Sequence, residues 1–479
     1  MEFTGRTRDL ELIAHQLRLV TDGAAGTPGR AVIVTGRRRV GKSRLIQEFC
    51  DRADVPYTVF QATRGRNPSA ERADFVETAS RMGSPGADLI RGLSATDWNQ
   101  ALRALAVAVP DDRPSIAVID EVPWLVEQDR EFEGALQTVW DRDLSNKPVL
   151  LILVGSDISV MEALGARDRP FFGRATKMTV EPLDVADVQT MTGLDAAAAI
   201  DARLITGGFP QILTSWRPGM DRLDFLREST ADPLSPLLVA GELSLLGEFP
   251  EGTRSRAVLQ AIGSGERTFS TIAAQAGSQG DLPAGTLNPL LKTLQDKRIV
   301  AADYPVSTVA DTKNKRYRIT DSYLRFWLAF LERSLPLVER GRGDLALARI
   351  ERSWTSWRGR AVEPLIRASL LRLLPDQNWP DTEEVGGWWN RTNTPEVDLI
   401  GTDRSPVAKS IHFVGSIKWL ENHPFDRHDY DALSRSLLAI PGTDPDTALV
   451  AVSRCGITPD AGVAQWWGPD ELVSAWRRP

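Results

Sequence analysis

The stretch AVIVTGRRRVGKS, residues 31–43, decides the fold of this chain. Its first five residues form a short run of mostly β-branched residues, and a loop framed by glycines follows. The next segment, SRLIQEFCDRA, places Leu45, Ile46 and Phe49 on one helical stripe. The order strand, loop, helix is typical of a phosphate-binding loop at the edge of a parallel sheet. The stretch therefore predicts an α/β fold with a nucleotide site.

The loop itself fits the Walker A pattern, a glycine, four variable residues, then glycine, lysine and serine. In such a loop the backbone N–H groups converge on phosphates, the lysine reaches the β and γ oxygens, and the hydroxyl binds Mg²⁺. The arginines at 37–39 occupy free positions, where they add positive potential without being required. We expect ATP and Mg²⁺ as ligands, with candidate contacts at Gly36, Arg39, Val40, Gly41, Lys42 and Ser43.

Three more apolar runs supply further strands, at residues 57–62, 115–121 and 149–157, with helical patterns between them. Alternating apolar strands and helices predict a parallel sheet covered on both faces. An extra strand between Walker A and the acidic strand end also indicates the division of NTPases that uses a catalytic glutamate.

Candidate catalytic groups follow these strands. We expect Asp120 to hold Mg²⁺ through water and Glu121 to orient and deprotonate the attacking water. Two readings fit Ser156, a sensor of the γ-phosphate or a serine that opens a loop. Two also fit Arg174, a charge that stabilises the transition state or a solvated surface arginine.

The 479 residues allow about three domains. We predict a P-loop core at 1–180, a helical lid at 181–250, a winged helix-turn-helix at 251–335 and a Trp-rich domain at 340–479. No apolar run approaches the roughly 20 residues that cross a bilayer. Two distant cysteines offer no disulfide framework. We therefore predict a cytoplasmic protein without membrane contact.

The winged module leaves its partner open. Its second helix carries few basic residues, whereas the wing, KNKRYR at 313–318, groups charge around one aromatic. Such a wing suits DNA phosphates, but winged helices also serve as lids or docks for proteins. The net charge of −7 argues against a chain that coats nucleic acid through bulk electrostatics, and it leaves a local basic face possible.

Two late runs, PEVDLI at 395–400 and HFVGSIKWL at 412–420, read as strands. Side chains two apart share a face of a strand, so Glu396 lies with Asp398, and Ser416 lies with Lys418. Adjacent strands would bring carboxylates beside a lysine. This is the pattern of metal-assisted phosphodiester cleavage, in which Lys418 positions the nucleophilic water.

The successive motifs FTGRTRDLELI, GRRRVGKS, AVIDEVPWL, ILVGSD, PFFGR, GGFP and RYRITDSYLRFWLAF resemble the archaeal-type P-loop ATPases of the AAA+/STAND superfamily. The resemblance covers essentially the whole chain. It implies a P-loop sheet, then a winged helix, then an α/β restriction-endonuclease-like domain of the PD-(D/E)XK type. It also implies that Arg6 lies near the nucleotide, Pro210 beside the base and Arg174 near the γ-phosphate.

The resemblance matches Glu363 to an acid that precedes the nuclease core and, with Asp398, to the metal site. Where the family has Gly-Glu-Cys-Lys-Trp, this chain has Ser416 in place of the acid. The loss of one carboxylate weakens a Mg²⁺ site that has few protein ligands. Either the domain is a degenerate nuclease kept for binding, or Glu396 compensates and it still cuts.

The sequence thus predicts a Mg²⁺-dependent ATPase whose nucleotide state sets the arrangement of a winged helix and a nuclease-like domain acting on DNA. The alternative is a STAND-like regulatory switch that binds a protein partner and never touches DNA. Self-association follows if Arg174 serves a neighbouring subunit's ATP.

Overall fold

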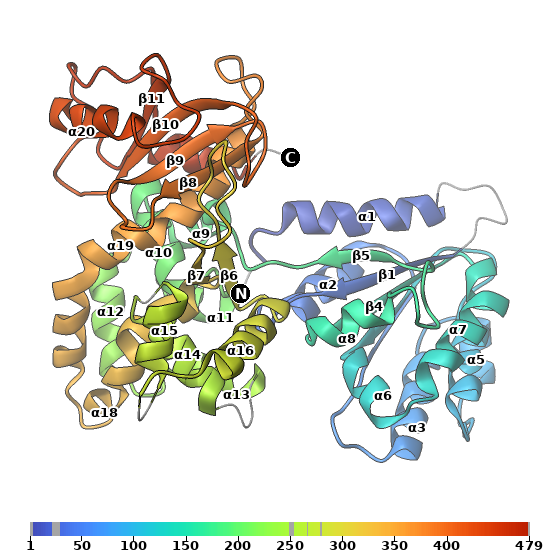
Figure 1. Cartoon of the computed structure of the whole chain (residues 1–479). Coiled ribbons are helices and arrows are strands. Elements are labelled where there is room, and N and C mark those ends of the chain that lie inside the picture. Colours follow the sequence, from blue (N-terminus) through green and yellow to red (C-terminus); the bar gives the residue numbers. More distant parts are fainter. Residues whose placement is uncertain (1–2, 22–28, 249–252, 266, 278–279, 478–479) are drawn as a thin grey trace. The chain divides into compact units, whose positions relative to one another are not determined.

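A computed structural model describes residues 3–21, 29–248, 253–265, 267–277 and 280–477. The chain divides into two compact units, Met1–Pro182 and Leu183–Pro479 (Figure 1). The predicted boundary between residues 250 and 251 lies outside the described residues. Within the described residues, no helix has the length and apolar character that a membrane crossing requires.

The first unit is built on a five-stranded sheet in the order β2-β3-β4-β1-β5, and every pair of neighbours is parallel. The three inner strands are buried almost throughout, which explains their continuous apolar sequences. The strands are β1 (Arg30–Thr35), β2 (Tyr57–Gln61), β3 (Ser115–Asp120), β4 (Val149–Gly155) and β5 (Thr176–Thr179).

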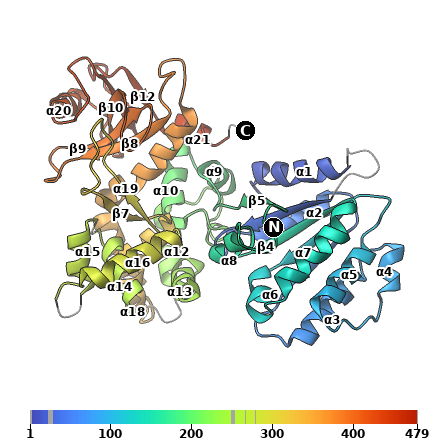
Figure 2. The ribbon, with the colours of Figure 1, turned by 45° about the vertical axis from the view of Figure 1, so that its right-hand side comes forward.

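Helices cover both faces of this sheet (Figure 2). On one face α3, α5 and α7 pack through a chain of edge-to-face rings, Phe60, Phe75, Trp98 and Phe132, whose centroids lie 4.9 to 5.5 Å apart. The other face is covered by α1 and α2. The helices are α1 (Thr7–Thr21), α2 (Lys42–Arg52), α3 (Pro68–Ala79), α4 (Pro85–Leu89), α5 (Trp98–Ala108), α6 (Val122–Gln128), α7 (Phe132–Arg142) and α8 (Ile158–Leu164).

The second unit begins with helices and continues with a three-helix module that ends in an antiparallel pair of strands. This is the order of elements that the sequence predicted for residues 251–335. The first helices are α9 (Val185–Thr192), α10 (Ala196–Thr206), α11 (Pro210–Leu213), α12 (Arg222–Ala231) and α13 (Pro236–Glu248). The module comprises α14 (Thr253–Gly263), α15 (Phe269–Ala276), α16 (Ala284–Asp296), β6 (Val300–Asp303) and β7 (Arg316–Ile319).

Two further helical segments connect this module to the last sheet. The first runs from α17 (Ser322–Phe326) through a π-helical turn (Trp327–Leu331) and a short 3-10 turn (Glu332–Ser334) to α18 (Leu335–Val338). The second, α19 (Gly343–Leu373), is a single helix of 31 residues.

A mixed five-stranded sheet in the order β12-β11-β10-β9-β8 closes the chain. Neighbours β8, β9 and β10 are antiparallel, whereas β10, β11 and β12 are parallel. Helices α19 and α20 cover opposite faces. The elements are β8 (Glu384–Trp389), β9 (Glu396–Thr402), β10 (Ile411–Lys418), α20 (Arg427–Leu437), β11 (Ala448–Ser453), β12 (Gln465–Trp467) and α21 (Pro469–Ser474).

The core of this sheet extends beyond the Trp-rich segment. Ala199 and Leu204 of α10 belong to the same apolar cluster as Val362 of α19 and Phe413 of β10. A fully buried arginine, Arg358, joins the same elements through hydrogen bonds. The sequence predicted a separate third core after residue 340. The structure instead shows that residues of α9 and α10 are part of this core.

Candidate functional site

The loop after β1 has the backbone of a phosphate cradle. Gly36 has φ +155° and Gly41 has φ +93°, conformations that residues with a Cβ atom rarely adopt. A Cβ at Gly36 would collide with the carbonyl oxygen of Val180. Helix α2 starts directly after Gly41, so the N–H groups of its first turn are available to an anion.

The side chain of Lys42 lies within this loop and makes hydrogen bonds with its backbone. Its ammonium donates to the carbonyl oxygens of Gly36 at 2.8 Å and Arg37 at 3.0 Å. Burial lowers the pKa of Lys42 to about 8, although the carboxylates of Glu121 and Asp120 act in the opposite direction. An incoming phosphate would supply the negative charge that favours the protonated amine.

Ser43 and Asp120 meet although 77 positions separate them. The Ser43 hydroxyl donates to Oδ2 of Asp120 at 2.6 Å. Strand β3 ends at Asp120, and β1, which precedes the loop, lies in the same parallel sheet. A hydroxyl and a carboxylate that converge beside a phosphate cradle are the oxygen ligands that Mg²⁺ prefers.

Glu121 stands next to this pair in a constrained backbone. Its φ of +56° is unusual for a residue with a side chain and turns the chain from β3 into α6. The Ser156 hydroxyl, which follows β4, donates to Oε1 of Glu121 at 3.0 Å. Because β4 lies between β3 and β1, the strand order brings Ser156, Glu121 and the loop to one edge of the sheet.

Arg6 lies against the loop from α1's side. Its guanidinium donates to the carbonyl oxygen of Val40 at 2.5 Å, to Asp9 at 3.0 Å and to the carbonyl oxygen of Glu181. Arg6 is buried. The arginine therefore holds the backbone of the phosphate loop.

The structure does not bring Arg174 to this edge, which corrects the expectation that it lies near the γ-phosphate of its own chain. Strand β5 runs parallel to β1 with Thr176 beside Val32 and Thr179 beside Thr35, so Arg174 precedes the end opposite the loop. Its guanidinium makes two 2.7 Å hydrogen bonds with Asp141 at the end of α7. The Arg174 side chain lowers the pKa of Asp141.

Pro210 belongs to the second unit, where it is the first residue of α11. Two glycines with positive φ, Gly207 and Gly208, precede it. Its place beside the base stays a prediction.

Two arginines flank the site: Arg38, which the sequence indicated only as added positive potential, and Arg64, which the sequence did not single out. The guanidinium of Arg64 lies 4.8 Å from the ring centroid of Trp124, and that of Arg38 lies 5.6 Å from it. Trp124 is three residues after Glu121 on α6, and Arg64 follows β2. The one available signal was an arginine that follows a strand of the nucleotide-binding sheet.

The carboxylates that the sequence predicted for a metal site in the C-terminal sheet make hydrogen bonds with other protein groups. Oδ2 of Asp398 accepts from the Ser416 hydroxyl at 3.0 Å and from the N–H of Ile417 at 2.8 Å. Burial raises the pKa of Asp398. Arg367 of α19 donates to Oε2 of Glu363, on the same helix, at 3.1 Å and to the Asp398 carbonyl oxygen at 2.8 Å.

Burial raises the pKa of Glu363 to about 7, Arg367 opposes that shift, and the carboxylates of Asp398 and Glu396 add to it. Glu396 is held by Arg316 and, at 3.4 Å, by Arg267. Its pKa is lowered by these arginines against an opposing effect of burial.

Lys418 is paired with a carboxylate other than Asp398. Its ammonium donates to Asp429 of α20 at 2.6 Å. Among the described residues, the group close enough to hold a metal ion is His423, Asp426 and Asp429, while Glu363, Asp398 and Glu396 form no such group. The structure therefore does not bring the predicted carboxylates and lysine together around one point.

Comparisons with known proteins agree with the first unit. Residues 14–198 match a family described as an ATPase domain predominantly from Archaea. Residues 327–429 match a family of archaeal and bacterial proteins of unknown function. An uncharacterised protein of Methanocaldococcus jannaschii is 25% identical over 396 residues, which cover 81% of this chain and 82% of that protein.

Solved structures resemble the chain at low identity. A Walker-type ATPase of Pyrococcus abyssi is 19% identical, with a TM-score of 0.48, over 68% of this chain and 96% of that one. The ORC2 protein of Aeropyrum pernix is 14% identical, with a TM-score of 0.44, over 72% of this chain and 95% of that one.

Proposed function

We propose that this chain binds ATP with Mg²⁺ and hydrolyses it in the cytoplasm, because residues 14–198 match a family described as an ATPase domain predominantly from Archaea. The observation that carries the proposal is the convergence of Ser43, Asp120, Glu121 and Ser156 at the edge of the sheet where the phosphate loop begins. Each group has the chemistry that phosphoryl transfer requires.

Ser43 and Asp120 would hold the Mg²⁺ ion, which when bound neutralises charge on the phosphates. Lys42 would contact the β and γ oxygens, since its ammonium already lies inside the loop. Arg6 would keep the loop in shape through Val40.

Glu121 would accept the proton of the attacking water, and Ser156 would orient that carboxylate through their 3.0 Å hydrogen bond. Arg38 and Arg64 are placed to add positive charge at the same edge. These two arginines replace Arg174 as candidates for charge stabilisation within one chain.

Glu121→Gln tests the proposal. The variant should bind ATP with unchanged affinity and hydrolyse it at least 100-fold more slowly, because an amide cannot accept the proton. Single-turnover hydrolysis and nucleotide binding are measured on the same protein, with Glu127→Gln as the matched control. Unchanged turnover would assign the general base to another residue.

We further propose that the C-terminal sheet is a nuclease-like domain that does not cut DNA. Ser416 occupies the place of a metal-binding acid and donates to Asp398, while Lys418 is paired with Asp429. The predicted metal ligand Glu363 is bonded to Arg367. These contacts support a domain kept for binding.

Nucleotide state would then act on the winged helix and on this domain. The wing at residues 313–318 was the best candidate for DNA contact. Two of its arginines, however, make hydrogen bonds within the chain: Arg316 donates to Glu396, and Arg318 donates to Asp303 at 2.8 Å. Arginines used inside the chain are less available to phosphates. This favours the second candidate, a regulatory switch with a protein partner, over a switch that acts on DNA.

A mobility shift with duplex DNA separates the two. A DNA-acting switch binds with an affinity that falls steeply with salt and differs between ATP and ADP. We expect no shift beyond weak, nucleotide-independent binding. Nucleotide-dependent binding that Lys313→Ala and Lys315→Ala abolish would restore the DNA hypothesis.

A further inference from the structure

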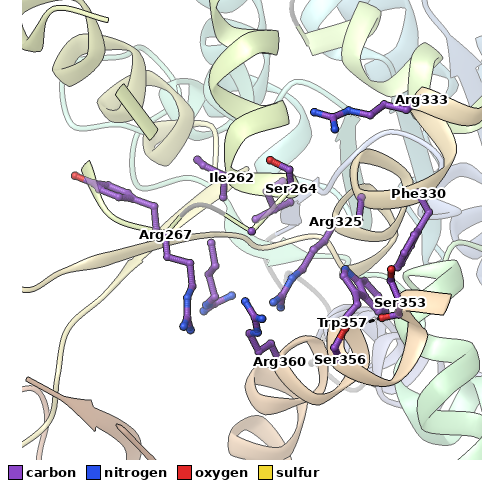
Figure 3. A pocket seen from close by; sticks show the side chains of 16 residues that line it. Ile262, Ser264, Arg267, Arg325, Phe330, Arg333, Ser353, Ser356, Trp357 and Arg360 are labelled. Atoms are coloured by element: carbon purple, nitrogen blue, oxygen red, sulfur yellow. Dashed lines mark hydrogen bonds between the residues drawn. The ribbon is translucent and has the colours of Figure 1, made fainter. Parts of the chain in front are cut away.

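A cavity of about 300 Å³ in the second unit is unusually basic (Figure 3). It lies between the three-helix module, the π-helical turn and α19. Among the described residues that line it, none is acidic. Its cationic side chains are Arg267, Arg318, Arg325, Arg333 and Arg360.

Few of these charges are balanced by the protein. Arg318 bonds Asp303 at 2.8 Å, and Arg267 lies 3.4 Å from Glu396. The guanidinium groups of Arg325, Arg333 and Arg360 make no hydrogen bond or ion pair with any part of the chain that the structure describes. Figure 3 shows Arg325 and Arg360 reaching toward each other from α17 and α19, with Arg267 beside them.

Arg325 is the most constrained of the set. Burial lowers the pKa of Arg325 to about 10, the Glu363 carboxylate opposes that shift, and Arg318, Arg267 and Arg360 add to it. A cation held among like charges without a hydrogen-bond partner destabilises a fold unless an anion joins it.

Part of the cavity lining is aromatic. Phe330 and Trp357 lie edge to face with centroids 5.5 Å apart. The indole N–H of Trp357 is buried without a hydrogen-bond partner among the described residues. Phe330 sits on the π-helical turn, a distortion that often marks a functional site.

We propose that this cavity binds a small, multiply phosphorylated molecule of about nucleotide size. The guanidinium forks match phosphate oxygens, and several unpaired forks together call for more than one negative charge. A volume of about 300 Å³ is at the lower end of small-molecule sites, and its aromatic wall suits an apolar or planar part of the ligand.

The cavity is compact, at about 300 Å³, which favours such a molecule over a nucleic-acid strand, whose recognition needs a long groove that follows the backbone. The site lies entirely within residues 262–360, so it is separate from the phosphate loop of the first unit. It therefore shares no residue with the ATP site proposed at Lys42.

Calorimetric titration of the full chain tests the site, with diphosphate and ADP as probes. The Lys42→Ala background weakens binding at the phosphate loop, so that the remaining signal reports the second unit. Arg360→Ala should weaken that binding at least 10-fold, because it removes a charge-assisted fork. Arg352→Ala, an exposed arginine on the same helix that does not line the cavity, should leave it unchanged.

Arg325→Met adds a second readout. It should raise the midpoint of thermal unfolding without ligand, because it removes the poorly balanced charge, and it should abolish the shift that diphosphate causes. Arg360→Ala carries the test should Arg325→Met not fold, because Arg360 is exposed.

Three results would overturn the proposal. The first is binding that Arg360→Ala and Arg325→Met leave intact. The second is citrate binding as tightly as diphosphate, which would show a general anion site. The third is a 12-nucleotide single strand that binds while diphosphate and ADP do not.

Discussion

The hydroxyl of Ser43 donates a 2.6 Å hydrogen bond to the carboxylate of Asp120. Asp120 ends β3, and one strand, β4, separates β3 from β1, the strand that precedes the phosphate loop. In the proposed loaded state Ser43 would bind Mg²⁺ and Asp120 would hold the ion through water, which would neutralise charge on the phosphates. The pair therefore links the phosphate loop to the strand that carries the proposed general base.

Asp120→Asn should separate nucleotide binding from metal binding. The amide keeps a hydrogen bond to Ser43 but loses the charge that Mg²⁺ needs, so MgATP affinity should fall about 10-fold or more. Affinity for ATP in EDTA should stay within about twofold. Titration with a fluorescent ATP analogue measures both. An equal loss with and without Mg²⁺ would show that Asp120 supports the loop rather than the ion.

ATP binding should weaken as pH rises above about 8. The pKa of Lys42 is lowered to about 8 in the free protein, so above that pH the amine is increasingly neutral and phosphate binding requires proton uptake. Affinity should fall up to about tenfold per pH unit until the pKa of the bound state is reached. Calorimetry in buffers of different ionisation enthalpy reports that proton. Constant affinity from pH 7.5 to 9.5 would contradict it.

Arg174 should serve ATP only across a subunit boundary, because its own chain holds it at the opposite edge of the sheet by Asp141. ATP turnover per chain should then rise with protein concentration. Mixing Arg174→Ala with Lys42→Ala should restore part of the activity that neither variant has alone, since one supplies the loop and the other the arginine. Activity of Arg174→Ala equal to the unmodified protein at all concentrations would leave this arginine with a structural role.

Much of the first unit could be predicted because its chemistry follows local sequence rules. A buried parallel strand is an apolar run, and polar groups directly after such strands meet at one edge. Strand β5 was missed because its sequence, TKMT, has one buried side chain and no apolar run. Arg64 and Trp124 were missed because their contact depends on how β2 and α6 pack.

The second unit shows the limits of spacing arguments. Strand alternation places Ser416 and Lys418 on one face, but it does not predict that Asp429 of another helix captures the lysine. The basic wing could be read from sequence, whereas the pairing of Arg316 with Glu396 joins residues 80 positions apart. Ion pairs between residues far apart in the sequence determine which charged side chains can bind a ligand. Such pairs could not be predicted from a single sequence.

The buried network at Asp201 should be essential for the second unit. Arg358 donates to Asp201 at 3.0 Å, to Glu421 at 2.8 Å and to the Trp419 carbonyl oxygen at 3.2 Å, and Arg454 lies 3.2 Å from Asp201. Asp201→Ala leaves buried cations without their partner and should cost about 3 to 5 kcal/mol of unfolding free energy. Denaturant unfolding measures it, with the exposed Asp224→Ala as control. A loss below about 1 kcal/mol would mean that water replaces the carboxylate.

Ser416→Glu should rebuild a metal site in the C-terminal sheet. The hydroxyl of Ser416 lies 3.0 Å from Asp398, so a longer side chain with a carboxylate can join Asp398 around one cation. Without metal the variant should unfold more easily, by about 1 to 3 kcal/mol, because it loses that hydrogen bond and adds a like charge. Mn²⁺ should reverse the loss, whereas Ser416→Gln, of the same size without the charge, should gain no metal response.

Cleavage of DNA should need one more change. Lys418 is held by Asp429 at 2.6 Å, so the lysine that would position water is diverted in Ser416→Glu as well. Plasmid nicking with Mn²⁺, in the Lys42→Ala background, should therefore be absent in the unmodified protein and in Ser416→Glu, and it should emerge only when Asp429→Asn is added. Efficient cutting by the unmodified protein that Asp398→Ala abolishes would instead show a working nuclease, with Glu396 as the substitute ligand. Such a result would return DNA to the centre of the proposed function, because the contacts that now occupy Asp398 and Lys418 would have to open during turnover.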